Sequence, residues 1–173
     1  MKLLGAILAG GQSRRFGSDK ACALLDGKPL LDHVADALGS QVDSIVVCGR
    51  RWPGRACLPD RPAPDLGPLG GLNAALHHAA GHGFDAVLSA GCDTPRLPDD
   101  LSGRFGTGGY LADLPIMGLW PASLAPRLDR FLGEDPIRSM RGWAQVAELA
   151  PLPGGAAIAN VNRPADLALL RNG

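Results

Sequence analysis

Three short apolar segments, each followed by a loop, constrain the fold of this chain more than any other feature. They lie at residues 3–9, 45–48 and 86–90, and the loops after them are rich in glycine, proline and aspartate. Apolar residues at helical spacing then occupy residues 30–38 and 69–79. Strands that alternate with helices pair side by side in one direction. This order predicts a Rossmann-like, three-layer α/β/α fold with a mostly parallel sheet.

Beyond residue 100 the pattern is less regular. The elements expected there are two strands, a helix, a helical turn, a further strand and a final helix, at residues 110–112, 116–120, 124–132, 136–143, 146–149 and up to about Leu170. No repeat or linker divides the chain, and its 173 residues are close to the usual size of a domain. We therefore expect one domain that spans residues 1–173.

Charge and composition argue against several classes of function. Lysine and arginine total 17, aspartate and glutamate also total 17, and the formal net charge is zero. Nothing in this balance favours nucleic acid or a membrane surface as a partner. No segment approaches the roughly 18 apolar residues of a membrane-spanning helix. We expect a soluble, cytoplasmic protein.

The four cysteines form no metal-binding or disulfide pattern. Cys22, Cys48, Cys57 and Cys92 are widely spaced, without a Cys-x-x-Cys pair. We expect them to be buried free thiols, which behave as small apolar side chains.

The loop after the first apolar segment, residues 8–20, combines paired glycines with three cationic side chains. Gly10-Gly11 lets the main chain turn tightly and approach a ligand, while Arg14, Arg15 and Lys20 supply positive charge. The loop matches neither the Walker A pattern nor Gly-x-Gly-x-x-Gly. Taken alone, it is more typical of a solvated surface turn. Residues further along the chain change this interpretation to a triphosphate-binding loop.

Asp93 lies just past the third apolar segment, in the sequence Gly-Cys-Asp-Thr-Pro. In a parallel sheet, ligands bind outside the carboxyl ends of the strands, so Asp93 and the 8–20 loop are expected at the same edge. A carboxylate there suits Mg²⁺, which prefers oxygen ligands and shares its shell with substrate phosphates. Taken alone, this aspartate is more typical of a turn. Asp19, next to Lys20, is expected in a first helical turn or a local ion pair, with no catalytic role.

Residues 65–71, Asp-Leu-Gly-Pro-Leu-Gly-Gly, directly precede a predicted helix, where a flat base or ribose could approach the main chain. A tight loop explains Gly67-Pro68. Gly70 and Gly71 in the first helical turn cost about 1 kcal/mol each relative to alanine, so close packing or a ligand must compensate.

Asn160 and Asn162 flank Val161, and in an extended segment both side chains point to the same side. Two amides on one face can bind a polar ligand. Capping of the helix after Pro164 explains them equally well, and Asn162 or Asp166 could be that cap.

Five motifs together resemble the molybdenum cofactor guanylyltransferase family. They are Leu-Ala-Gly-Gly-x-Ser-x-Arg-Phe-Gly-x-x-Lys at 8–20, Gly-Lys-Pro-Leu at 27–30, Gly-Pro-Leu-Gly-Gly at 67–71, Cys-Asp-Thr-Pro at 92–95 and Asn-Val-Asn at 160–162. Their order and spacing match the family over nearly the whole chain. Related sugar-nucleotide and cytidylyl transferases share the first motif, whereas the third and fourth together favour the guanylyl branch.

The resemblance implies a nucleotide-diphospho-sugar transferase-like fold and an enzyme that uses GTP, Mo-molybdopterin and Mg²⁺. Such a nucleotidyltransferase joins GMP to the terminal phosphate of molybdopterin and releases pyrophosphate. The contacts implied by position are Leu8, Ala9 and Gly10 with the nucleotide, Arg15 and Lys20 with its phosphates, Asp60 with its nucleoside end, Asp93 with the nucleotide and the metal, and Asn160 and Asn162 with the pterin side. Arg15, Lys20 and Asp93 are the implied catalytic residues. The attacking phosphate is already ionised near neutral pH, so no protein nucleophile is required.

Two alternatives stay open from the sequence. One is a cytidylyltransferase that uses CTP in the same chemistry. The other is a non-catalytic carrier of a nucleotide or of molybdopterin, against which the presence of Arg15, Lys20 and Asp93 together argues. In either case, transient contact with molybdenum cofactor biosynthesis proteins or apo-molybdoenzymes is expected.

The chain departs from the family pattern at a few positions. Cys48 stands where members often carry an asparagine that contacts the nucleotide, and Gly70 replaces a common alanine. Arg138 could supply a phosphate contact on the acceptor side.

Overall fold

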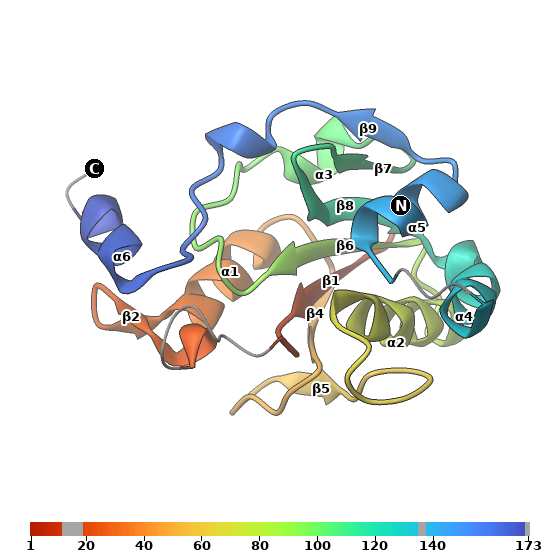
Figure 1. Ribbon diagram of the computed structural model, residues 1–173, viewed down its shortest axis with the longest axis horizontal. Coiled ribbons are helices and arrows are strands. Elements are labelled where there is room, and N and C mark those ends of the chain that lie inside the picture. The colour runs from red at the N-terminus through yellow and green to blue at the C-terminus, as the bar shows by residue number, and fades with distance from the viewer. Residues whose placement is uncertain (12–18, 135–137, 172–173) are drawn as a thin grey trace.

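The structure, a computed structural model, describes residues 1–11, 19–134 and 138–171. Seven strands form one sheet in the order β5-β4-β1-β6-β8-β7-β9 (Figure 1). Their bounds are β1 Leu3–Leu8, β4 Ser44–Cys48, β5 Ala56–Leu58, β6 Ala86–Gly91, β7 Gly109–Leu111, β8 Leu114–Pro121 and β9 Ala150–Leu152. β1 pairs in parallel with β4 and β6, and β8 runs antiparallel to β6 and β7. The predicted mostly parallel sheet is confirmed.

Helices cover both faces of this sheet. Their bounds are α1 Leu30–Gly39, α2 Pro68–Gly81, α3 Leu101–Arg104, α4 Ala125–Glu134, α5 Met140–Val146 and α6 Pro164–Arg171. Single 3₁₀ turns occur at η1 Lys20–Cys22, η2 Ala122–Leu124 and η3 Gly155–Ala157, and a two-stranded hairpin joins β2 Leu24–Leu25 to β3 Lys28–Pro29.

Alternation along β1 explains the three layers. Successive side chains of a strand point to opposite faces. Leu4, Ala6 and Leu8 pack in one apolar core with α2, α4 and α5. Leu3 and Ile7 pack in a second core with α1 and α3. The predicted α/β/α sandwich is therefore confirmed, with β1 buried between two helical layers.

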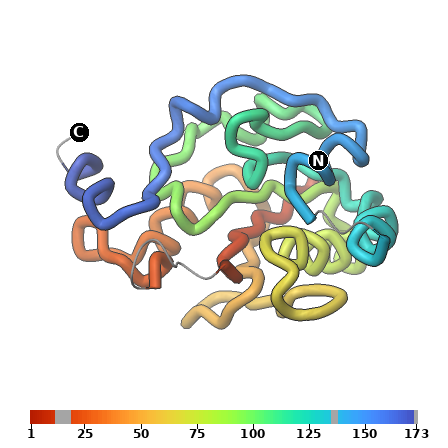
Figure 2. Tube along the Cα trace, viewed as in Figure 1, coloured from red at the N-terminus to blue at the C-terminus, as the bar shows by residue number. Residues whose placement is uncertain are grey.

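The C-terminal segment returns to the N-terminal part of the chain. Val161 and Leu170 pack with Leu25 and Leu30 in a third, smaller apolar cluster. Figure 2 shows the final helix beside the hairpin that follows residue 22, and Arg171 donates a hydrogen bond to the Leu24 carbonyl over 3.1 Å. Residues far apart in the sequence thus lie together at this end of the sheet.

Two sequence expectations are wrong in detail. The strand expected at 146–149 is not a strand, because α5 continues through Val146 and ends in a turn where Glu148 has φ +57°. The strand there is β9, which begins at Ala150. Of the four cysteines expected to be buried, only Cys48 is fully buried. Cys57 and Cys92 are partly buried, and Cys22 is exposed, because it lies in η1 at the protein surface.

None of the helices in the described part of the chain combines the length and the apolar character needed to cross a bilayer.

Candidate functional site

Several of the expected residues lie together at the carboxyl ends of β1 and β6. A pocket of about 180 Å³ opens there. Its lining includes Leu8, Ala9, Gly10, Gly11, Lys20, Pro68, Gly91, Cys92, Asp93 and Ile116. Since β1 lies between β4 and β6 in the sheet, the 8–11 segment is at the centre of this edge. The predicted convergence of Asp93 with the 8–20 loop is confirmed for the described ends of that loop, residues 8–11 and Lys20. Arg14 and Arg15 lie outside the described residues.

Lys20 and Asp93 form an ion pair across the pocket. Lys20 lies on η1, Asp93 follows β6, and the Lys20 Nζ to Asp93 Oδ2 distance is 3.3 Å. Their side chains are only 15% and 23% exposed, so both charges are largely removed from water. A cation and a carboxylate held this close can be shared with a phosphate and a metal ion.

Asp60 lies on the other side of β1, among four glycines. A Cβ atom added to Gly10 would lie 3.6 Å from both Asp60 carboxylate oxygens, and one added to Gly49 would lie 3.0 Å from Oδ1. Gly70 and Gly71 of α2 approach the same side chain from the helix. Within the described part of the chain, buried Oδ1 has no hydrogen-bond partner. Burial, and secondarily the charge of Asp65, raise the pKa of the Asp60 carboxyl.

Close packing explains the two glycines in the first turn of α2. A Cβ at Gly70 would lie 3.0 Å from the Cβ of Asp60, and a Cβ at Gly71 would lie 2.9 Å from the Cβ of Cys48. Real Cβ atoms essentially never come as close as 2.9 Å to a neighbour, and a 3.0 Å contact requires the neighbour to move by a few tenths of an ångström. Cys48 is therefore a packing residue under α2, and burial raises the pKa of its thiol strongly.

The Asn160–Asn162 segment lies against Asp93. The Val161 amide donates a hydrogen bond to the Asp93 carbonyl over 2.8 Å, and the Val161 side chain is fully buried. Asn160 is half-buried, with an unpartnered Oδ1 among the described atoms, and Asn162 is exposed. Of the two residues expected to cap the final helix, Asp166 does so. Its Oδ2 accepts hydrogen bonds from the amides of Asn162 and Arg163, each over 2.8 Å. The two asparagine amide groups therefore are not needed as caps.

The contact between Arg50 and Asp19 at this edge could not be predicted from the sequence. Arg50 donates to both carboxylate oxygens of Asp19, which also accepts from the Ala21 amide over 3.2 Å and so caps η1. The sequence suggested that Asp19 pairs with a nearby residue. Its partner is Arg50, which lies 31 residues away, so no local pattern could identify it.

A larger hollow of about 540 Å³ lies beside the pocket, under the loop between β4 and β5. Gly49, Arg50, Trp52 and Arg55 are among its lining residues, and the Arg50 guanidinium lies 5.5 Å from the centre of the Trp52 ring. Arg138, expected as a possible acceptor contact, is exposed.

The residues at the edge fit a metal ion only together with substrate oxygens. Within the described ranges, no three His, Cys, Asp or Glu side chains cluster as a complete metal site. Asp93 offers one carboxylate, and Mg²⁺ in phosphate-transfer sites typically takes one or two carboxylates plus substrate phosphates and waters. Burial, with the nearby Asp93 charge, raises the pKa of Cys92 to about 11, so its thiol stays protonated near neutral pH.

Comparison with known proteins gives one consistent family. Residues 5–149 match the model of the MobA-like NTP transferase domain. The chain is 38% identical over 187 residues to a molybdenum cofactor guanylyltransferase of Rhodobacter capsulatus, which covers 97% of this chain and 94% of that protein.

Two solved structures share the fold. The molybdopterin-guanine dinucleotide biosynthesis protein A of Archaeoglobus fulgidus is 20% identical, with a TM-score of 0.69 over 99% of this chain and 97% of that one. Rv0371c of Mycobacterium tuberculosis, solved in complex with manganese, is 12% identical, with a TM-score of 0.61 over the full length of both chains.

Proposed function

We propose residue roles for a chain that belongs to the MobA-like NTP transferase family and is a molybdenum cofactor guanylyltransferase. The enzyme is a nucleotidyltransferase that transfers GMP from GTP to Mo-molybdopterin, forming molybdopterin guanine dinucleotide and pyrophosphate. One observation supports these roles most directly. A carboxylate oxygen of Asp60, which has no hydrogen-bond partner among the described atoms, lies among four glycines, on the opposite side of β1 from the Lys20–Asp93 pair.

Asp60 selects the base. The Watson–Crick edge of guanine carries two adjacent donors, N1–H and the N2 amino group, which match the two oxygens of a carboxylate. Cytosine presents acceptors at O2 and N3, which an ionised carboxylate repels. Gly10 and Gly49 pack directly against the Asp60 carboxylate, so the main chain at the ends of β1 and β4 lies beside the group assigned to the base. This chemistry favours GTP over the CTP of the alternative reading.

Lys20 and the 8–11 segment bind the rest of the nucleotide. Leu8, Ala9 and Gly10 present main chain to the nucleoside and the α-phosphate, and the Lys20 ammonium neutralises phosphate oxygens as a compact charge. From its position in the sequence motif, we assign Arg15 to the same phosphates, because a guanidinium group can bind two phosphate oxygens at once. Their positive charge stabilises the pyrophosphate as it leaves.

Asp93 would hold the magnesium ion together with phosphate oxygens of GTP. When bound, such an ion neutralises the phosphates and orients the attacking and leaving oxygens. Lys20, 3.3 Å from Asp93, is placed to neutralise the same phosphates from the protein side.

The acceptor phosphate attacks directly, without a covalent enzyme intermediate. Support comes from the protonated state of Cys92, the thiol nearest to Asp93 in the pocket, whose pKa is raised to about 11. Asn160 and Asn162 would bind the pterin side, and the hydrogen bond from Val161 to Asp93 holds that segment beside the metal ligand. Asn160 Oδ1 is buried and has no hydrogen-bond partner among the described atoms.

We further propose that residues 1–173 act as one nucleotidyltransferase domain in the cytoplasm, where the product passes to apo-molybdoenzymes or to other proteins of molybdenum cofactor synthesis. This proposal follows from the reaction itself, since its product is a cofactor that other enzymes use.

Asp60→Asn tests the base assignment. The asparagine keeps the shape but turns one acceptor into a donor that faces guanine N–H groups. The expected result is a GTP affinity lower by about tenfold to a hundredfold, the value of hydrogen bonds to a charged group, with little change for CTP. Calorimetric titration with GTP and CTP in the presence of Mg²⁺ measures both. Equal affinity of the wild-type protein for the two nucleotides would remove Asp60 from base selection.

Asp93→Ala tests the metal assignment. Because Asp93 is the one carboxylate assigned to the ion, the variant should lose Mg²⁺-dependent guanylyl transfer by about a thousandfold while keeping a wild-type circular dichroism spectrum. Transfer from radiolabelled GTP to Mo-molybdopterin provides the measurement. Substantial remaining activity at ordinary Mg²⁺ concentrations would contradict the role.

A further inference from the structure

Two consecutive residues, Gly49 and Arg50, contact both described ends of the phosphate-binding loop. Gly49 has φ +83°, and a Cβ there would lie 2.5 Å from the Gly10 Cα, so glycine alone fits. Just before it, the Cys48 carbonyl accepts a hydrogen bond from the Ala9 amide over 3.0 Å. The start of the loop is therefore packed directly against the end of β4.

Arg50 reaches the other end of the loop. One guanidinium nitrogen, Nη1, lies 2.7 Å from Asp19 Oδ1, and the other, Nη2, donates to Oδ2. This two-pronged arrangement fixes orientation as well as distance. The pairing, with the hydrogen bond from Cys22, holds the pKa of Asp19 at about 2, so the carboxylate is ionised at any working pH.

Asp19 in turn orders the turn that carries Lys20. Its Oδ1 accepts from the Ala21 amide over 3.2 Å, which caps η1. A single 3₁₀ turn has little stability of its own, so its direction depends on such contacts. Lys20 is the first residue of this turn, and its Nζ lies 3.3 Å from Asp93 Oδ2. The line of contacts therefore runs from Arg50 through Asp19 to the ammonium group in the pocket.

We propose that Arg50 is a positioning residue for Lys20, acting through Asp19. Its two terminal nitrogens are engaged by Asp19, so they support the loop rather than a phosphate. The inference rests on the proposed contact of Lys20 with GTP.

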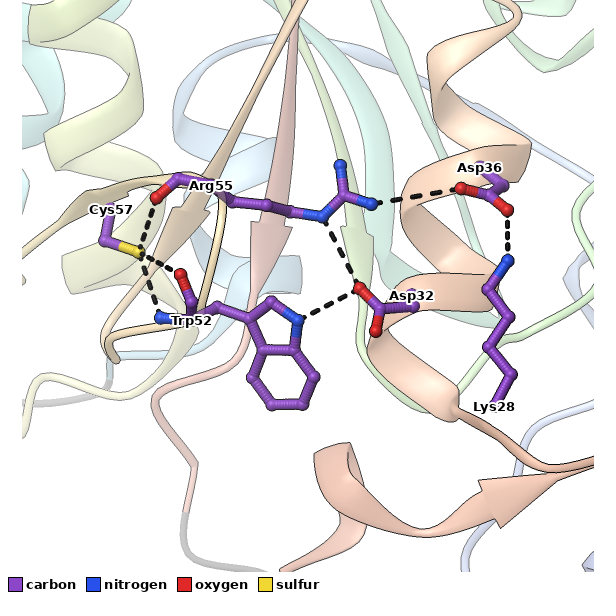
Figure 3. A network of polar contacts seen from close by, with 6 residues as sticks. All are labelled: Lys28, Asp32, Asp36, Trp52, Arg55 and Cys57. Atoms are coloured by element: carbon purple, nitrogen blue, oxygen red, sulfur yellow. Dashed lines mark hydrogen bonds and ion pairs between the residues drawn. The ribbon is translucent and has the colours of Figure 1, made fainter.

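The test compares Arg50→Gln, Arg50→Lys, Lys20→Ala and the double variant Lys20→Ala/Arg50→Gln. Arg55→Gln is the matched control, because Arg55 lies in the same loop but pairs with Asp32 and Asp36 of α1 (Figure 3). Calorimetry gives the GTP dissociation constant with Mg²⁺, steady-state transfer to Mo-molybdopterin gives kcat and KM, and thermal unfolding reports folding.

Arg50→Gln should raise the GTP dissociation constant and lower kcat by about tenfold each, the effect of losing a charge-assisted contact. Arg50→Lys, which keeps the charge without the fork, should recover part of both losses. Arg55→Gln should leave both parameters within about twofold of wild type. In the Lys20→Ala background, Arg50→Gln should add less than about twofold, because interacting residues are not additive.

Two outcomes overturn the inference, and they differ from failure of the Lys20 assignment. If Arg50→Gln changes only the unfolding temperature, or if its effect multiplies fully with that of Lys20→Ala, Arg50 does not act through Lys20. If Lys20→Ala itself leaves GTP affinity and kcat unchanged, the proposed role of Lys20 fails, and this inference fails with it.

Discussion

Asp60 lowers the stability of the protein in the absence of a ligand. Its Oδ1 is buried without a partner among the described atoms, and the raised pKa of its carboxyl reflects the cost of burying the ionised form. When folding raises the pKa of a carboxyl, ionising that group destabilises the folded protein. This destabilisation is absent below the pKa of the unfolded chain, here 3.8, and reaches its full value above the pKa of the folded protein. The penalty therefore grows as pH rises through this window.

Asp60→Asn should for this reason stabilise the free protein near neutral pH. The expected result is an unfolding temperature a few degrees above that of wild type at pH 7, with a difference that shrinks as pH falls towards about 4. Differential scanning calorimetry across this pH range checks it. A stabilisation that stays constant with pH would show that the carboxylate charge is not its cause.

At the scale of elements, α2 is placed by glycines rather than by apolar periodicity alone. Gly70 and Gly71 bring its first turn against Asp60 and Cys48, which sets the distance between the helix and the carboxyl ends of β4 and β5. Gly81, the last residue of the same helix, has no other atom within 4 Å of its hypothetical Cβ. The same substitution should therefore have opposite effects at the two ends of one helix.

Gly71→Ala should destabilise the protein by about 1–3 kcal/mol, as overpacking does, despite the better helix propensity of alanine. Gly81→Ala should be neutral or stabilise by up to about 1 kcal/mol. Urea unfolding of both variants measures the two free energies. If Gly71→Ala were as stable as wild type, the close approach to Cys48 would not limit the packing of α2.

The elements that the sequence predicted well are those that depend on local pattern. The apolar segment at β1 and the helical spacing at α1 are set by alternation within a few residues, and both elements were expected within a residue of their bounds. The antiparallel direction of β8 and the strand β9 depend on pairing with distant residues, Ser89 with Gly118 and Gly109 with Ala150, which no local pattern reveals. The Asp19–Arg50 pair escaped prediction for the same reason.

At the scale of the whole molecule, the candidate site joins two distant parts of the chain. The proposed nucleotide side comes from residues 8–11, Lys20, Asp60 and Asp93, and the proposed acceptor side comes from the segment around Val161. The position of Asp93 at this edge could be predicted from the sequence, because strand order brings it there. The hydrogen bond that joins Val161 to Asp93 required the structure.

Asn160→Ala and Asn162→Ala should separate the two sides. Each variant should raise KM for Mo-molybdopterin by about tenfold, the value of one or two lost hydrogen bonds, and leave the GTP dissociation constant unchanged. Steady-state transfer assays and GTP titrations of the same preparations give both values. A parallel loss of GTP affinity would mean that the asparagines belong to the nucleotide side.

The hydrogen bond from the Val161 amide to the Asp93 carbonyl also sets an order of events during synthesis. A ribosome that has made β1, α2 and β6 has already supplied Lys20, Asp60 and Asp93, and at about 5–20 residues per second the remaining stretch takes several seconds more. During that interval the Asp93 loop lacks this hydrogen-bond partner. A nascent chain therefore completes the hydrogen bonding of its Asp93 loop only after residue 161 has left the exit tunnel, so the proposed nucleotide and acceptor sides come together last.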